Sequence, residues 1–456
     1  MRSLGSGRPP HLAVLVAVLT AGLTGCTAAP GTTGSGSSTV GATGEAACVA
    51  AVDRVVAAVE EQVRSYDLAP APAATAATAP SANTPSTTTP LGAATPAPGS
   101  DATAPVAPTT TAADLADTLA AAREVIAANR CAQEFVSSGL TTKLAGIRTR
   151  GPIAAAVLSR LTASITGKVG PTPISREVAP GEDLVGVLAQ VPAGSTVRLG
   201  VGEYHLSEPL VLLESVTIVG EGRDDSSIVS SAPDAAVLVL SPGRVELTGF
   251  SLVRAPGSAG SGIITGPAAA LVLTGMRISG NRASATAQGG AAVHLSAQAS
   301  DAVPRATTFE MTDSELVDNE WAGVAVSGAH QVSIESSSLV RNRECGICFL
   351  DRASGSVARS TFTDNGVGAA AVGTAHPVLI DDTFSGGEVG IQADEDAAPG
   401  LQGNTIRGVA RAAVILTGRS GGTVEGTSCP SAPFGIVIGK QATPTLLRNA
   451  CTAVGL

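Results

Sequence analysis

Two rows of apolar residues repeat in register through the C-terminal half of this chain. Neighbouring members of each row are 22 or 23 residues apart, and each member of the second row follows a member of the first by five residues. A period of this length indicates a solenoid, because each turn buries its side chains against the turns above and below it. The first row is Met311, Ile334, Val357, Leu379, Leu401, Val424 and Leu446, and the second is Leu316, Leu339, Phe362, Phe384, Ile406, Cys429 and Cys451.

The repeat extends towards the N-terminus, where Leu273 and Ile278 show the same offset of five residues. The step from Ile278 to Leu316 is 38 residues, which is more than one turn requires. We therefore expect a loop that protrudes from the solenoid over about residues 282–305.

The composition suits stacked strands better than an irregular globule. Hydrophobic residues make up 44% of the 456 residues, but aromatic residues only 2%. Such a core must be built mainly from Val, Ile, Leu and Ala, of which the first two favour strands. The formal net charge of -10 argues against nucleic acid or an anionic membrane surface as the main ligand.

The N-terminus is typical of an exported protein. Arg2 and Arg8 precede the short apolar run 12–19, which is too short to span a bilayer. The following Leu-Thr-Gly-Cys, residues 23–26, resembles the lipobox of bacterial lipoproteins. That resemblance implies cleavage before Cys26 and lipidation of its sulfur. We therefore expect an extracytoplasmic protein, lipid-anchored to the outer face of a bacterial cell membrane.

Composition and periodicity divide the chain into segments. Residues 1–25 are the predicted signal peptide and residues 26–44 a flexible tether. Residues 45–167 form a small helical region, interrupted at 69–111 by an Ala-, Pro- and Thr-rich linker that we expect to be disordered. Residues 175–456 form the solenoid.

Three helices are expected in the helical region. Apolar residues at three- and four-residue spacing predict one helix from Cys48 to Tyr66 and a second from about Ala113 to Phe135. A third begins at Pro152, a residue type favoured in the first helical turn. From Asp183 onward the pattern becomes strand-like.

Seven cysteines suit an oxidising compartment, since Cys26 as a lipid acceptor leaves six. The register favours a disulfide between Cys429 and Cys451, which lie at equivalent sites on adjacent turns. Cys48 would then pair with Cys131. For Cys345 and Cys348 two states are possible from the sequence, a pair of free thiols or a strained disulfide. A metal or redox role for them is disfavoured, because the sequence has no second CxxC and no His at the spacing of a metal ligand.

The segments Val191–Leu206 and Val216–Gly222 resemble the opening turns of right-handed parallel β-helix proteins of the pectin-lyase-like superfamily. The resemblance covers about residues 180–456 and implies three short strands per turn. One corner of each turn carries Asn, at Asn281, Asn319, Asn342 and Asn365, and we expect these residues to form a structural ladder.

Candidate sites for chemistry are weak. Glu335, Arg359, Asp381 and Asp382 fall on neighbouring turns, where carboxylates beside an Arg could hold Ca²⁺, protonate a glycosidic oxygen or bind a uronate. The superfamily's motifs do not strengthen the case, because the Asp and the Gly-His-Gly expected after the paired Asp are missing. Trp321 is either a stacking platform for a sugar or packs under the loop at 282–305.

The sequence predicts a mainly β protein: a right-handed parallel β-helix preceded by a small helical region and a disordered linker. We expect it to bind a glycan or cell-envelope polymer along one face without clear catalysis. One alternative is a polysaccharide lyase, hydrolase or epimerase, and another is a protein-binding scaffold or adhesin. We expect no cofactor or resident metal, with Ca²⁺ relevant only to the lyase alternative, and no nucleic acid or membrane contact beyond the lipid anchor.

Overall fold

The computed structural model describes residues 41–67, 121–122, 124–126, 128–129, 131, 133–149, 152–165, 172–241, 243–266, 269–283, 289–295 and 307–455. The predicted signal peptide, Cys26 and the linker 69–111 lie outside these residues.

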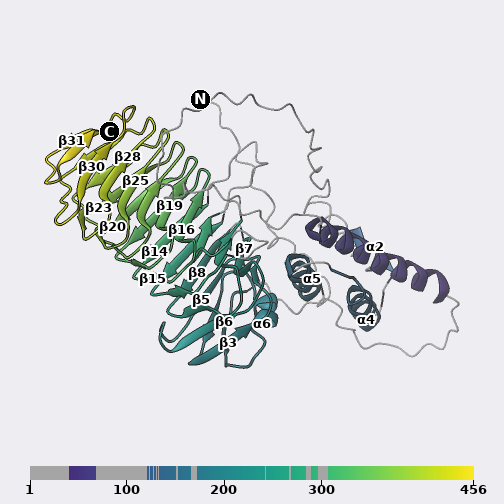
Figure 1. Ribbon diagram of the computed structural model, residues 1–456. Coiled ribbons are helices and arrows are strands. Elements are labelled where there is room, and N and C mark those ends of the chain that lie inside the picture. The colour runs from purple at the N-terminus through teal and green to yellow at the C-terminus, as the bar shows by residue number, and fades with distance from the viewer. Residues whose placement is uncertain are drawn as a thin grey trace.

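The described strands stack into a parallel solenoid of about 11 turns, with helices beyond its N-terminal end (Figure 1). They form three sheets of 12, nine and 11 strands. Sheet A contains β1 (Ser175–Val178), β2 (Ser195–Leu199), β5 (Val216–Val219), β8 (Arg244–Thr248), β11 (Ala270–Thr274), β14 (Thr308–Thr312), β17 (Gln331–Glu335), β20 (Ser354–Ala358), β23 (His376–Ile380), β26 (Gly400–Gln402), β29 (Thr423–Glu425) and β31 (Thr445–Leu447).

Sheets B and C complete each turn. Sheet B contains β3 (Gly202–Leu206), β6 (Ser226–Ser230), β9 (Ser251–Arg254), β12 (Arg277–Ser279), β15 (Glu315–Val317), β18 (Ser338–Val340), β21 (Thr361–Thr363), β24 (Thr383–Ser385) and β27 (Thr405–Arg407). Sheet C contains β4 (Leu210–Leu212), β7 (Ala235–Val239), β10 (Ser261–Thr265), β13 (Val293–Leu295), β16 (Ala322–Ser327), β19 (Cys345–Leu350), β22 (Val367–Ala371), β25 (Val389–Ala393), β28 (Ala412–Leu416), β30 (Phe434–Ile438) and β32 (Ala453–Gly455).

The predicted register is confirmed. Successive members of the row from Met311 to Leu446 are partners on neighbouring strands of sheet A. Leu316 to Ile406 are partners in sheet B in the same way. Both rows point into the solenoid, where Phe362 and Phe384 stack with ring centroids 4.5 Å apart. Burial of each such side chain contributes about 1.5–3 kcal/mol to folding.

The corners depend on left-handed backbone at recurring positions. Between sheets A and B, φ is 56° at Asp313, 51° at Arg359 and 54° at Asp381. Between sheets B and C, φ is 58° at Asp318 and 51° at Arg341. Polar residues with short side chains tolerate this conformation better than β-branched ones. The residue after each of these positions turns inward and is buried.

The expected loop at 282–305 is only partly a loop. Val293–Leu295 forms β13, which pairs with β10 on one side and β16 on the other. The additional residues therefore lie in two insertions, one before and one after a regular strand. Parts of both, 284–288 and 296–306, lie outside the described residues.

The helical region differs from the prediction at its helix ends. Helix α2 (Gly41–Asp67) begins inside the predicted tether. Within the predicted helix 113–135, residues 121–122, 124–126 and 128 are helical, and a separate helix, α4 (Gln133–Leu144), begins where that prediction ended. Helix α5 (Pro152–Ile165) begins at the expected residue. The three helices pack around one apolar cluster, and the structure joins Cys48 to Cys131.

Helix α6 (Leu184–Gln190) occupies residues for which the sequence predicts a strand-like pattern. Asp183 caps its N-terminus by accepting a hydrogen bond of 3.0 Å from the Gly186 amide, a recognised start signal. Helix α6 packs against α5 and β4. It therefore connects the helical region to the first turns of the solenoid.

Candidate functional site

A polar trough follows the corner between sheets B and C across several turns. It encloses about 570 Å³. One wall is the β9–β10 connection at residues 257–259, and the floor follows the corners after β12, β15 and β18. Its charged lining residues are Arg282, Asp318, Glu320, Arg341 and Arg343. The same corner repeats from turn to turn, so the trough runs along the solenoid axis.

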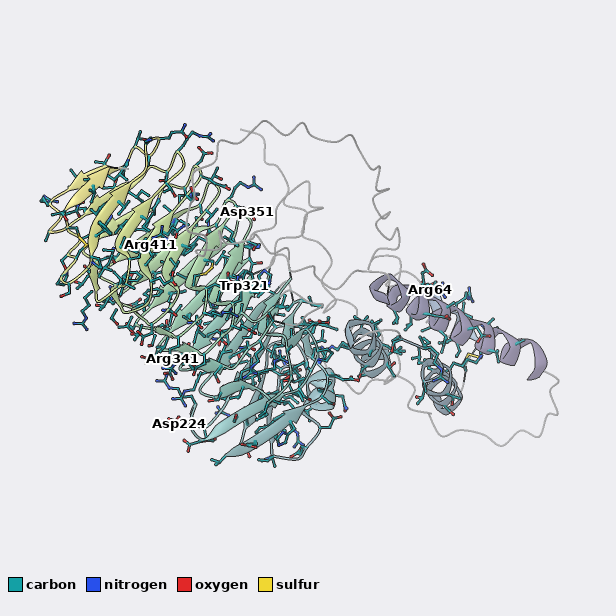
Figure 2. All side chains as sticks on the ribbon, viewed as in Figure 1. Arg64, Asp224, Trp321, Arg341, Asp351 and Arg411 are labelled. Carbon is teal, nitrogen blue, oxygen red and sulfur yellow. A yellow bond between two sulfur atoms is a disulfide. The ribbon has the colours of Figure 1, made fainter. Side chains whose placement is uncertain are left out.

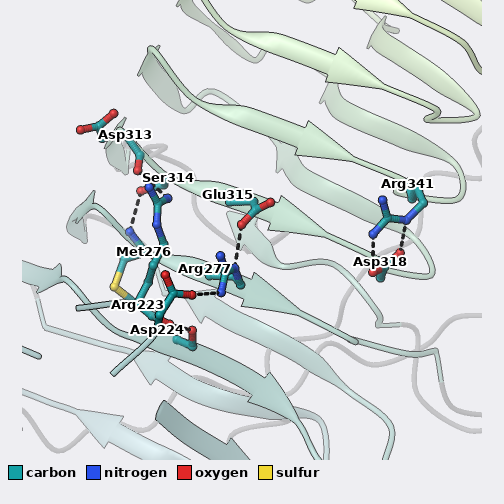
Figure 3. Close-up of polar contacts among 10 residues, drawn as sticks. Arg223, Asp224, Met276, Arg277, Asp313, Ser314, Glu315, Asp318 and Arg341 are labelled. Atoms are coloured by element: carbon teal, nitrogen blue, oxygen red, sulfur yellow. Dashed lines mark hydrogen bonds and ion pairs between the residues drawn. The ribbon is translucent and has the colours of Figure 1, made fainter. Parts of the chain in front are cut away.

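Ion pairs hold the trough's side chains in place. Arg341 donates from Nε and Nη2 to the two Asp318 carboxylate oxygens, at 2.7 and 2.8 Å (Figure 3). Arg343 donates to Glu320 at 3.2 Å, and Glu320 also accepts a hydrogen bond from the Ala283 amide at 3.0 Å. The bidentate pair is the geometrically more specific of the two.

Arg282 differs from these paired residues. Within the described part of the chain its exposed side chain takes part in no hydrogen bond or ion pair. The five lining charges therefore leave one positive charge unbalanced in a protein of net charge -10. A trough with several donor groups and one unpaired guanidinium suits a ligand rich in hydroxyl or other oxygen acceptors.

The adjoining outer face of sheet B carries a second network. Arg277 donates to Glu315 at 2.7 Å and to Asp224 at 2.5 Å (Figure 3). Figure 2 shows Asp224 and Arg341 on the same edge of the solenoid. Charged groups thus continue beyond the trough towards the N-terminal turns.

Directly beneath the trough, the four predicted Asn residues form a hydrogen-bonded stack. Asn281 donates to Asn319 at 2.7 Å, Asn319 to Asn342 at 2.8 Å, and Asn342 to Asn365 at 3.0 Å. All four are buried. The stack ends where the next turn carries Gly387, with φ of 71°, because an added Cβ there would lie 1.9 Å from the Asn365 carbonyl oxygen.

The structure places the four carboxylate-cluster residues on neighbouring turns but exposes only three of them. Glu335 and Arg359 form an exposed ion pair, and Asp381 is exposed at its left-handed corner. Asp382 instead points inward and is 1% exposed. Its Oδ1 accepts a hydrogen bond of 2.8 Å from the Ser360 amide, while its Oδ2 has no partner.

The pKa of Asp382 is raised to about 7, mainly by burial. Hydrogen bonds from the Ser360 and Ile380 backbones and the nearby Arg359 charge oppose the shift, whereas the neighbouring Asp381 carboxylate adds to it. A carboxyl group sealed inside a corner cannot reach a polymer on the outer surface. The four residues therefore comprise an exposed pair, a neighbouring exposed Asp381 and a buried Asp382, and the outward orientation expected of Asp382 is corrected.

Trp321 lies half-buried beside His294, edge to face, with ring centroids 5.2 Å apart. It packs against an apolar cluster that includes Cys345 and Cys348, which the structure joins as a disulfide within β19. Burial and the nearby His330 lower the pKa of His294 to about 4, so this imidazole is neutral. The packing makes Trp321 part of a folded cluster, while its half-buried side chain keeps some exposed surface.

One further prediction concerns the last cysteine pair. The structure joins Cys429 to Cys451 across adjacent turns. In the described part of the chain no group of three or more His, Cys, Asp or Glu side chains is arranged to hold a metal ion. Among the same residues no helix is long and apolar enough to cross a membrane.

Comparison with known proteins agrees with the observed geometry. Residues 303–454 match the family model described as the right handed beta helix region. The fold is a right-handed parallel β-helix. No curated protein sequence matches the chain.

Several solved structures are similar at low sequence identity. A protein of Geobacillus virus E2 is 11% identical over 57% of this chain and 54% of its own, with a TM-score of 0.41. The A-module of mannuronan C-5 epimerase from Azotobacter vinelandii is 15% identical over 58% of this chain and 87% of its own, at 0.39. The catalytic domain of an α-1,3-glucanase is 10% identical over 59% of this chain and 56% of its own, at 0.44. The chain thus spans little more than half the length of the first and third.

Proposed function

We propose that this protein is a lipid-anchored, extracytoplasmic β-helix protein that binds a glycan or cell-envelope polymer in the trough between sheets B and C. The observation that carries the proposal is the elongated trough, in which paired Arg and carboxylate groups and the unpaired Arg282 face solvent. Sugar hydroxyls both donate and accept hydrogen bonds, so an array of preordered donors and acceptors is a suitable surface for them.

Binding without catalysis fits the two carboxylates that line the trough. Asp318 is held by Arg341, and Glu320 by Arg343 and the Ala283 amide. Most glycoside hydrolases use two carboxyl groups that flank the scissile bond, one of them protonated. Asp382 has a suitably raised pKa but lies inside the corner, away from the trough.

The test uses protein lacking residues 1–26 and a panel of neutral and uronate-rich polysaccharides, with and without Ca²⁺. We expect retention without new chain ends. Replacing both Arg341 and Arg343 by Ala should weaken retention about tenfold, equivalent to about 1.4 kcal/mol, because two hydrogen-bonding guanidinium groups are lost. Arg419→Ala is the matched control, since Arg419 makes a similar bidentate pair with Asp396 at a different corner.

The other outcomes identify the alternative functions. New polysaccharide chain ends would show that the protein is a lyase or hydrolase. Product formed only in the presence of Ca²⁺ would support the lyase alternative. Retention unaffected by the double substitution would remove the trough as the binding surface. No retention on any polysaccharide would favour a protein-binding scaffold.

Lipid anchoring has its own test in a bacterial host that modifies lipoproteins. Cys26→Ala should move at least about nine tenths of the protein from the membrane fraction to the soluble fraction or medium, because the acyl chains that provide stable anchoring are no longer attached. Thr27→Ala keeps the acceptor cysteine and should remain with the membrane. Membrane association unchanged by Cys26→Ala would contradict the proposal.

A further inference from the structure

The C-terminal end of the solenoid carries a charge opposite to that of the rest of the chain. Residues 401–456 contain five basic side chains and one acidic side chain, a local charge of +4 in a chain of net charge -10. All five basic side chains are exposed, at Arg407, Arg411, Arg419, Lys440 and Arg448. The net charge of the whole chain therefore does not describe this end.

Two of these cations are balanced by neighbours and three are not. Arg419 and Arg448 each form an ion pair with an acidic residue of the preceding turn. Among the residues that the structure describes, Arg407, Arg411 and Lys440 take part in no ion pair. These three cations remain available to an external anionic partner.

Apolar side chains are exposed at the same end. Ile415, Val437 and Val454 are register partners on the last three strands of sheet C, and the exposed fraction rises from 7% at Ile415 to 43% at Val454. Phe434, at the start of β30, is 54% exposed. With Leu447 on sheet A, the last two turns hold three of the six exposed large hydrophobic residues in the described chain.

Two of the unpaired cations flank the apolar side chains of sheet C. Arg411 directly precedes β28, at the corner between sheets B and C, and Lys440 follows β30, at the corner between sheets C and A. A five-residue strand spans about 16 Å, so the two cations lie roughly one sheet width apart. Acidic corner residues begin one turn earlier, at Glu388 and Asp394. The cationic and apolar surface is thus confined to the last turns. We call it the C-terminal tip, formed by Arg411, Phe434, Val437, Lys440 and Val454.

The composition of the C-terminal tip limits the kind of partner. A second copy docked end to end would bring like charges together. A soluble polyanion would pair with the cations but leave Phe434 and Val454 in water. An anionic lipid surface satisfies both groups, because its headgroups attract Lys and Arg while apolar side chains enter the boundary of the acyl region. At physiological salt, charges more than about 8 Å away are largely screened, so acidic residues on other turns do not prevent this contact.

We propose that the C-terminal tip binds an anionic lipid surface, with Arg411 and Lys440 at the headgroups and Phe434 and Val454 at the acyl boundary. The tip lies at the end of the solenoid opposite the helical region (Figure 1), and Figure 2 shows Arg411 remote from Arg64 of α2. Together with the N-terminal lipid anchor, the tip would hold the solenoid to the membrane at both ends. The proposal rests on the proposed anchor only for its setting, and it is independent of glycan binding in the trough.

The test uses protein that begins at Thr27, which keeps every described residue and carries no acyl chain. Sedimentation with vesicles measures binding to phosphatidylcholine alone and to an equimolar mixture of phosphatidylcholine and phosphatidylglycerol. We expect binding to the mixed vesicles to be at least about 30-fold tighter and to weaken as salt is added. Failure of this test is distinct from failure of the lipid anchor, which the fractionation of Cys26→Ala protein examines separately.

Substitutions at exposed positions check where the lipid binds. Arg411→Ala combined with Lys440→Ala should weaken binding to mixed vesicles about 30-fold, equivalent to about 2 kcal/mol. Arg198→Ala combined with Arg352→Ala is the matched control and should change it little, since both side chains are exposed on earlier turns and form no ion pair within the described chain. Phe434→Ala leaves every charge in place and should weaken binding about fivefold. Circular dichroism establishes that each variant is folded.

Three results would overturn the proposal. The first is a parent protein that does not bind the mixed vesicles. The second is equal binding by the tip double variant and the matched control. The third is unchanged binding by Phe434→Ala protein, which would assign the cations to a soluble polyanion instead of a bilayer.

Discussion

Asn342→Ala is expected to lower the free energy of unfolding by about 3–5 kcal/mol, because it interrupts the middle of a buried hydrogen-bonded stack. The Asn342 side chain donates to Asn365 at 3.0 Å and to the Leu316 carbonyl at 3.1 Å, and it accepts from Asn319 at 2.8 Å. The residue is fully buried, so water cannot replace these bonds. Each polar group left without a partner costs about 1–3 kcal/mol.

Urea unfolding followed by far-ultraviolet circular dichroism measures this loss. Asn281→Ala is the matched control, because Asn281 stands at the end of the same stack and, among the residues that the structure describes, its side chain donates only to Asn319. We expect a loss of about 1–2 kcal/mol there. Equal losses of unfolding free energy at both positions would mean that the stack stabilises the protein through single contacts. A loss below about 1 kcal/mol for Asn342→Ala would contradict a structural role for the ladder.

The register of the solenoid is predictable from sequence because its inward positions repeat with little exception. Met311 and Ile334 are apolar for the same reason, since each fills the same place in the interior of its turn. The Asn stack is predictable for a similar reason, because one corner demands an inward amide on turn after turn. Periodicity identifies positions that share an environment.

Positions next to a left-handed corner are harder to predict. Asp381 and Asp382 are identical in type and adjacent, yet only Asp381 faces solvent. The positive φ at Asp381 reverses the alternation of side chains that an extended strand would give. Sequence spacing alone therefore groups Asp382 with the exposed charges. Ser314, Ser337 and Ser360 occupy the same inward position on earlier turns. This recurrence of Ser is the sequence signal that distinguishes Asp382 from the exposed charged residues.

Helix α6 and the trough were not predictable from the sequence, for two different reasons. The α6 residues Leu184 to Gln190 are rich in Val and Leu, so their composition suits a strand, and only the Asp183 cap indicates a helix. The β9–β10 connection lines one part of the trough and lies more than 20 residues from the Arg and carboxylate residues that line the rest. No local pattern connects the two.

Asp382→Asn is expected to stabilise the protein at pH 8 by several kcal/mol and to have little effect near pH 4. The pKa of Asp382 is raised from 3.8 to about 7 in the folded protein, mainly by burial. The folded state therefore retains a proton that the unfolded state releases between these values. Stability falls as the pH rises from about 4 to about 7, by a total on the order of 4 kcal/mol, and this group contributes no further change above pH 7.

The equivalent position on the next turn shows why Asn should fit. Asn404 is fully buried, accepts a hydrogen bond from the Asp382 amide at 3.0 Å, and donates from Nδ2 to the Leu379 carbonyl at 3.0 Å. Val357 is the register partner of Leu379 one turn back. An Asn at position 382 would present its Nδ2 to the Val357 carbonyl in the same way, where the carboxylate Oδ2 now has no partner.

Urea unfolding of the parent and variant at pH 4, 6 and 8 tests this account. Asp381→Asn is the control, since it removes the same formal charge from the adjacent exposed residue and should change stability by less than about 0.5 kcal/mol at each pH. Parallel pH profiles for the parent and Asp382→Asn would show that the buried carboxyl does not carry the pH dependence. A gap that opens between pH 4 and pH 7 would assign this dependence to one side chain, because Asn reproduces the shape of the protonated carboxyl and lacks only its ionisation.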